Sequence, residues 1–202
     1  MGTHLYRSVV LSVVLLIVCG IGYNAAGWAL SQAAFHHQAN GSITPGGSSL
    51  IGQPWNNGTS INPMWFNGRP DPDNPLFLQG PSAPSGASGS SGASNLGPKS
   101  QKLVTTVQGI IAEWHAVGVN PTPDLVTSSG SGLDPDISAL DAQVQIPMVA
   151  KARGIAPSVL RTLVAQNTTG FQLGFLGSPY VNVLQLNEAL AAYVAAHRPP
   201  VG

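Results

Sequence analysis

The feature that most constrains this chain is a long uncharged apolar run near its beginning. No residue from Ser8 to Leu30 is charged, and residues 9–18 read VVLSVVLLIV. About twenty residues in a helix span the roughly 30 Å hydrocarbon core of a bilayer, and each Val, Leu or Ile favours insertion by roughly 0.3–0.6 kcal/mol. We therefore expect a retained transmembrane helix over residues 8–30. A cleaved signal peptide is the alternative, because Arg7 followed by an apolar run also fits one.

The charges that flank this run predict its orientation. Arg7 precedes it, whereas the next Lys or Arg after it is Arg69. Positively charged flanks stay in the cytoplasm. We expect a short cytoplasmic N-terminus at residues 1–7 and an extracytoplasmic domain at residues 31–202.

The second half of the predicted span is rich in small residues. Lipid provides no hydrophobic drive for helix association, so small residues that allow close backbone approach hold membrane helices together. This composition predicts a helix-packing face, and the alternative is the ordinary Gly and Ala content of a lone anchor. The candidate face consists of Gly20, Gly22, Ala25, Ala26 and Ala29.

Composition excludes several classes of protein. The chain holds eight Lys or Arg and eight Asp or Glu among 202 residues, with a net charge of zero. A nucleic-acid binder needs clustered positive charge, and an acidic or basic disordered chain would not be 43% hydrophobic. Cys19 is the one cysteine, so no internal disulfide can form.

Beyond the span, patterning predicts a mixed α/β domain of the α+β class, with its helices towards the C-terminal side. Residues 81–94 (PSAPSGASGSSGAS) have almost no apolar side chains and predict a flexible loop. The expected strands are short: Leu50–Ile51, Met64–Phe66 and Asp124–Thr127. Trp55, Trp65 and Phe66 could form a docking surface or pack into the core.

Helical periodicity marks four segments. The first covers residues 99–117. The second carries Ile137, Leu140, Val144 and Met148, bends or restarts at Pro147, and ends at Gly154. The third opens at Pro157. The last covers residues 183–196, with Asn182 and Gln185 placed for a capping box.

The Ser-Gly loop after Thr127 is the one candidate for chemistry. We interpret it as a rigid turn that enters a helix start at residues 134–136; an anion cradle of backbone N–H groups and a nucleophilic serine are the alternatives. No histidine spacing identifies a base, and no metal site is predicted, since His36 and His37 lack a third ligand. We therefore predict no catalytic residues. The loop consists of Ser129, Gly130, Ser131, Gly132 and Asp134.

Seven segments in this order resemble the C subunit of the bacterial Kdp-type potassium-transporting ATPase. The resemblance runs from the predicted span to about Leu190. Asp136, Ser178 and Tyr180 depart from the residues common in that family. The segments are QANGS (38–42), SLIGQ (49–53), FNGRP (66–70), SGASNLGP (91–98), DLVTSSGSGLDP (124–135), KARG (151–154) and GFLG (174–177) followed by VNVL (181–184).

The resemblance implies a non-catalytic accessory subunit in the bacterial inner membrane. Its implied partners are a channel-like potassium-binding subunit and a P-type pump subunit, and the family is described as a catalytic chaperone that promotes ATP binding by the pump. Neither a DKTGT phosphorylation motif nor a TVGYG-like filter is present. No cofactor is expected to bind directly; the complex would handle ATP and potassium. The alternative function is an independent extracytoplasmic hydrolase or ligand-binding protein that uses the Ser129–Ser131 loop.

Overall fold

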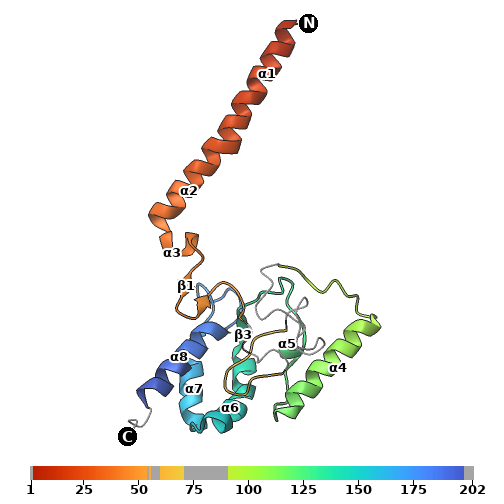
Figure 1. Cartoon of the computed structure of the whole chain (residues 1–202), viewed down its shortest axis with the longest axis vertical. Helices are drawn as coiled ribbons and strands as arrows, with labels where there is room; N and C mark the ends of the chain where they lie inside the picture. Colours follow the sequence, from red (N-terminus) through yellow and green to blue (C-terminus); the bar gives the residue numbers. More distant parts are fainter. Residues whose placement is uncertain (1, 54, 56–59, 71–90, 198–202) are drawn as a thin grey trace. The chain divides into compact units, whose positions relative to one another are not determined.

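The computed structural model describes residues 2–53, 55, 60–70 and 91–197, which divide into two units at Ile43/Thr44 (Figure 1). The first unit is dominated by one continuous helix, Gly2–Ala34, which is long and apolar enough to cross a membrane. It therefore extends beyond the expected limits of 8–30 at both ends. It consists of α1 (Gly2–Ile17), a π-helical turn η1 (Val18–Gly22) and α2 (Tyr23–Ala34), and the short α3 (His36–Ala39) follows.

The second unit is a mixed helix-and-sheet domain, as patterning predicts. Its antiparallel three-stranded sheet has the order β3–β5–β4, with Ile137 opposite Val181 and Val181 opposite Thr168. In Figure 1 the helices α6, α7 and α8 pack side by side. The strands are β1 (Ile43–Thr44), β2 (Gly47–Ser48), β3 (Asp136–Ser138), β4 (Thr168–Thr169) and β5 (Tyr180–Asn182). The helices are α4 (Gln101–Ala116), α5 (Pro123–Val126), α6 (Ala139–Arg153), α7 (Pro157–Gln166) and α8 (Val183–Ala196).

The four predicted helices are all present, because each has a clear apolar face or cap. Gly154 ends α6 with a left-handed φ of +66°. The side chain of Asn182 caps α8 by accepting the Gln185 N–H. Helix α6 runs through Pro147 without a restart, so of the two expected outcomes at this proline the restart is excluded.

The predicted strands are wrong. Residues 124–127 do not form a strand, since Pro123 sits at the first position of the helical turn α5, where its fixed φ favours a helix. Residues 50–51 and 64–65 lie in turns and bends, and Phe66 has no regular structure; its backbone is held by the side chain of Asn187 rather than by a neighbouring strand. The N-terminal part of the loop at 81–94 lies outside the described residues; its described part, 91–94, has no regular structure.

The expected helix start at residues 134–136 is also wrong. Asp136 opens strand β3, and α6 begins three residues later. There Ser138 and Asp141 form a capping box: Ser138 Oγ accepts the Asp141 N–H at 3.1 Å, and Asp141 Oδ2 accepts the Ser138 N–H at 2.8 Å. This pair satisfies two backbone donors at the N-terminus of α6, which explains why the helix begins here.

The domain core lies between the sheet, the C-terminal helices and α4. Trp114 is about 1% exposed, and its indole N–H donates to the Leu125 carbonyl at 3.1 Å. Phe66 is fully buried, so it belongs to the core and not to a docking surface. Trp55 and Trp65 pack against the edge of this core with ring centroids 5.3 Å apart, and Arg153 covers the Trp65 ring at 4.1 Å.

Candidate functional site

The membrane-length helix changes its hydrogen-bonding pattern in the region of the small residues. In η1 the Tyr23 N–H donates to the Val18 carbonyl, five residues back, and the side-chain amide of Asn24 donates to the Gly20 carbonyl at 2.6 Å. A π-turn of this kind interrupts the regular ladder and often marks a functional position in a helix. Asn24 satisfies its amide N–H within its own helix, so no partner is required for that donor.

The glycines of this helix are not required by packing inside the chain. A Cβ added to Gly20 or Gly27 would meet nothing within 4 Å, and one added to Gly22 would meet only its own helix, at Ile17 O. All five residues of the predicted packing face are exposed. The face therefore has room for the close approach of another helix.

The Ser-Gly loop in the domain is a hydrogen-bonded turn. Ser129 Oγ accepts the Gly132 N–H at 2.9 Å, Ser131 Oγ accepts the Leu133 N–H at 3.2 Å, and the two hydroxyls lie 3.1 Å apart. Gly132 has a φ of +70°, which favours glycine. Both hydroxyls thus serve the backbone of the loop, in agreement with the interpretation as a rigid turn.

The same loop anchors two distant segments of the domain. The Ser131 carbonyl accepts the Gly92 N–H at 2.8 Å and the Ser91 hydroxyl at 3.0 Å. On the other side, Arg69 forms an ion pair with Asp134 at 3.5 Å, and its guanidinium also donates to the Thr127 carbonyl at 3.4 Å. These contacts give Ser131 and Asp134 structural roles in joining the loop to residues 69 and 91–92.

The surroundings of Asp136 shift the pKa of its carboxyl group. Burial raises its pKa above the ordinary value of 3.8, the hydrogen bond from Asn182 Nδ2 at 3.0 Å opposes this, and the negative charge of Asp134 adds to the rise. Asn182 also donates to the Ser49 carbonyl at 2.9 Å. The carboxyl therefore joins strand β3 to residue 49 through Asn182.

The side-chain amides of Asn187 and Gln145 are buried and hold the start of the extended segment 66–70. Neither residue was predicted from the sequence to have this role. Asn187 accepts the Phe66 N–H at 3.0 Å and donates to the Phe66 carbonyl at 2.9 Å. Gln145 does the same for Asn67, at 2.8 and 3.0 Å. Both amides are fully buried. Asn187 lies on an otherwise apolar buried face of α8, a signal that could have identified it, whereas Gln145 shares the buried face of α6 with Asp141.

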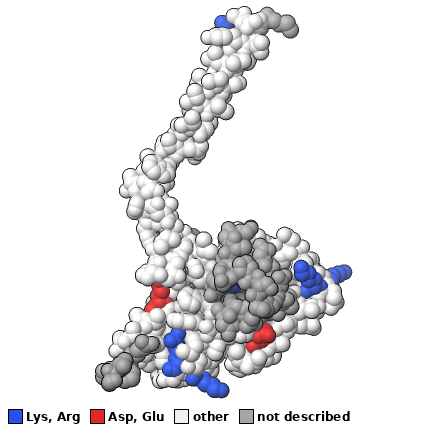
Figure 2. All heavy atoms as spheres, in the orientation of Figure 1, with Lys and Arg blue, Asp and Glu red and all other residues white. Residues whose placement is uncertain are grey.

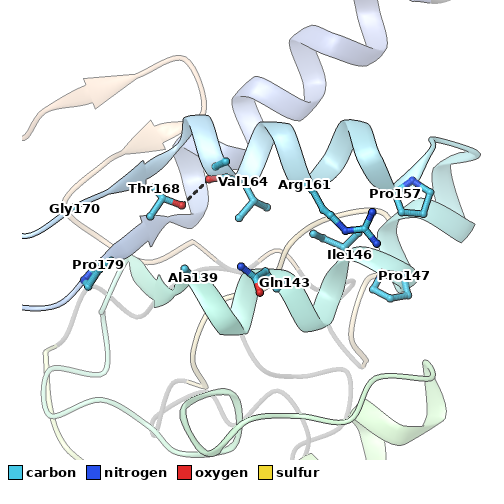
Figure 3. Close-up of a pocket in the computed structure, with 11 residues that line it drawn as sticks. Ala139, Gln143, Ile146, Pro147, Pro157, Arg161, Val164, Thr168, Gly170 and Pro179 are labelled. Atoms are coloured by element: carbon cyan, nitrogen blue, oxygen red, sulfur yellow. Dashed lines mark hydrogen bonds between the residues drawn. The ribbon is translucent and has the colours of Figure 1, made fainter.

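A groove of about 870 Å³ lies between α6 and α7. Figure 3 shows Gly170 and Pro179 at one end and Pro147 and Pro157 at the other, with Arg161 of α7 directed along it. Gly170 directly follows strand β4 and Pro179 directly precedes strand β5, so the segment between the two strands begins and ends at this end of the groove (Figure 3).

Together these features define a class: a protein with one membrane-length helix, a face of small residues on that helix, and a small mixed helix-and-sheet domain. Residues 5–192 match the family described as "K+-transporting ATPase, c chain". The chain belongs to this family.

Individual relatives match over nearly their whole length. The chain is 42% identical over 196 residues to a "Potassium-transporting ATPase KdpC subunit" of Sorangium cellulosum (strain So ce56), covering 93% of this chain and 96% of the relative. It is 46% identical over 198 residues to the subunit of the same name in Burkholderia cenocepacia (strain HI2424), covering 94% and 96%. A third such subunit, from Paraburkholderia xenovorans (strain LB400), is 46% identical over 199 residues. The sequence-based assignment to the potassium-transporting ATPase C subunits is thereby confirmed.

Proposed function

We propose that this chain is a non-catalytic accessory subunit that assembles and stabilises a channel-like subunit and a P-type pump subunit of a potassium-transporting ATPase. The observation that supports this most directly is the open face of small residues on the membrane-length helix. Among the described residues, Gly20 has no neighbour that would oppose a side chain and Gly22 would meet only its own helix, so packing within the described part of the chain does not require their small size. In a bilayer, such residues allow another helix to approach closely.

The same proposal places residues 1–7 in the cytoplasm and the domain outside. The basis is Arg7 before the helix and the absence of Lys and Arg from residues 8–68. An independent serine hydrolase has no comparable support, because the hydroxyls of Ser129 and Ser131 accept hydrogen bonds from the backbone of their own loop.

The proposal is tested by enlarging the helix face. Gly22→Leu or Ala26→Leu adds bulk where close approach is needed, so we expect less of the large membrane subunits to co-purify with a tagged chain in detergent. Val10→Leu, an exposed change on the same helix outside the small-residue face, is the matched control and should assemble normally. Normal recovery of the complex with both Gly22→Leu and Ala26→Leu would contradict the proposed packing face.

A further inference from the structure

The segment between β4 and β5 folds into an ordered hairpin. Gln172 and Leu176 exchange both backbone hydrogen bonds, each at 2.9 Å, and the Phe175 N–H donates to the Gln172 carbonyl at 3.2 Å. The turn between them is therefore closed by three backbone bonds. This order means that its side chains project from a defined backbone.

The tip of this hairpin carries an unusual set of exposed apolar side chains. Isolated exposed apolar residues are normal on a protein surface, but a group of them on one short element marks an interaction site. We call this group the hairpin tip. It consists of Phe171, Leu173, Phe175 and Leu176, which are 52%, 84%, 73% and 46% exposed.

Neither local conformation nor internal packing explains the leucine at the turn. Leu173 has a φ of +52° and Gly174 a φ of +82°, a pattern in which Asn-Gly is the favoured pair. A leucine at positive φ is strained, and this one is the most exposed residue of the tip. Backbone strain at this position is retained together with an exposed apolar side chain. A contact between that side chain and another molecule explains both features.

The charge pattern around the tip indicates which kind of molecule this is. Residues 162–187 contain no Asp, Glu, Lys, Arg or His, so Arg161 and Glu188 are the nearest charges in sequence on either side. Segments that bind membrane surfaces combine apolar residues with Lys or Arg, which attract anionic lipid. The hairpin tip has no Lys or Arg nearby in the sequence. An uncharged protein surface therefore suits it better as a binding partner than an anionic lipid surface does. Figure 2 shows how few charges the visible face of the chain carries as a whole.

We propose that the hairpin tip docks into an uncharged, apolar cleft of another subunit of the potassium-transporting ATPase. The proposal rests on the proposed function, since it requires that the chain be assembled with other subunits. The chain would then contact the other subunits at two places: through the small-residue face of the membrane-length helix and through the hairpin tip of the domain. The two apolar rings and two leucines act as the buried anchors of that contact.

The first test replaces the anchor without disturbing the turn. Asn accepts positive φ, so Leu173→Asn keeps the hairpin and removes the apolar side chain. Loss of a buried anchor weakens an interface about tenfold or more. We expect a corresponding loss of the large subunits in a detergent pull-down with the full chain, and unchanged thermal unfolding of the isolated chain. Val104→Asn, at an exposed apolar position on α4, is the control and should assemble like the parent.

The second test identifies the molecule that the tip contacts. A photo-crosslinking phenylalanine analogue at Phe175 in the assembled complex should form an adduct with another subunit, and the same analogue at Val104 should not. Adducts with lipid or with a second copy of this chain would overturn the proposal, as would normal assembly of Leu173→Asn. If the parent chain itself recovers no other subunit, the proposed function fails instead, so the two failures are distinguishable.

Discussion

The side chain of Asn187 holds the backbone of Phe66 by two hydrogen bonds, one from the Phe66 N–H to Oδ1 at 3.0 Å and one from Nδ2 to the Phe66 carbonyl at 2.9 Å. An amide has the same donor and acceptor as a peptide group, so Asn187 replaces the neighbouring strand that this buried segment lacks. Gln145 repeats the arrangement at Asn67. Segment 66–70 is thereby fixed between α6 and α8, and Arg69 reaches Asp134 from it.

We predict that Asn187→Leu destabilises the chain by about 2–4 kcal/mol, because it leaves the N–H and C=O of Phe66 buried without partners. The free energy of unfolding in urea, measured on the full chain in detergent, checks this. Gln185→Leu changes an exposed amide on the same helix and should cost less than about 0.5 kcal/mol. If Asn187→Leu and Gln185→Leu lowered the free energy of unfolding equally, the two hydrogen bonds from Asn187 to Phe66 would make no specific contribution to stability.

The two glycines of the Ser-Gly loop should respond differently to substitution. From sequence both are expected to resist Val, but only Gly132 has a positive φ, whereas a Cβ on Gly130 would meet nothing within 4 Å. We therefore expect Gly132→Val to lower the melting temperature by several degrees and Gly130→Val to be tolerated.

Ser129→Ala and Ser131→Ala should leave potassium-dependent ATPase activity of the complex within a few-fold of the parent. Complete loss of activity in a well-assembled Ser131→Ala complex would restore a chemical role for that hydroxyl.

The raised pKa of Asp136 predicts a pH dependence of stability. The folded chain holds this proton more tightly than the unfolded chain does, so the stabilising contribution is complete below the unfolded pKa and is lost as pH rises through the folded pKa. Asp136→Asn keeps an oxygen for the Asn182 amide and removes the charge. We expect it to raise the melting temperature by a few degrees at pH 7 and to weaken the decline in stability above about pH 4. Asp124→Asn, at an exposed carboxylate on α5, should leave that decline unchanged.

The helices were predictable from sequence because their signals are local. Gly154 and Asn182 stand where a helix ends and begins, and apolar periodicity places the faces between them. Ser138 and Asp141 carried an equally local capping signal that the apolar position of Ile137 obscured, and the helix start was consequently placed too early.

The strands and the amide contacts were not predictable in the same way. Strands β3 and β5 have three residues each, too few for a period of two to be recognised, and they depend on pairing between residues about 45 apart. Phe66 looked like part of a strand, but its partner is a side chain 121 residues away. The Ser-Gly loop contains the hydrogen-bonded turn that Ser and Gly favour locally, but it leads into strand β3 and not into a helix.

The proposed topology predicts which residues an impermeant maleimide can reach. Ser85 and Ser90, in the predicted flexible loop at 81–94, would also suit labelling from outside but lie outside the described residues. Ser158 is exposed on α7 and suits the experiment. In a chain with Cys19→Ala, we expect Ser158→Cys to react in intact spheroplasts and Thr3→Cys to react only after lysis. The reverse pattern would show that the domain faces the cytoplasm.

The last prediction concerns ATP, for which the role implied by the family resemblance conflicts with the proposed topology. The proposed orientation places the domain where ATP is essentially absent, and residues 1–7 contain one Lys or Arg, Arg7, and no Gly-rich loop. Any gain in ATP affinity of the pump must then arise indirectly, from a shift in its conformational equilibrium, and such couplings are typically about 5–150-fold. We expect the purified full chain to show no saturable ATP binding by calorimetry at millimolar nucleotide, while the assembled complex binds ATP more tightly than a complex that lacks this chain. Saturable binding by the chain alone would replace the indirect mechanism with a direct one.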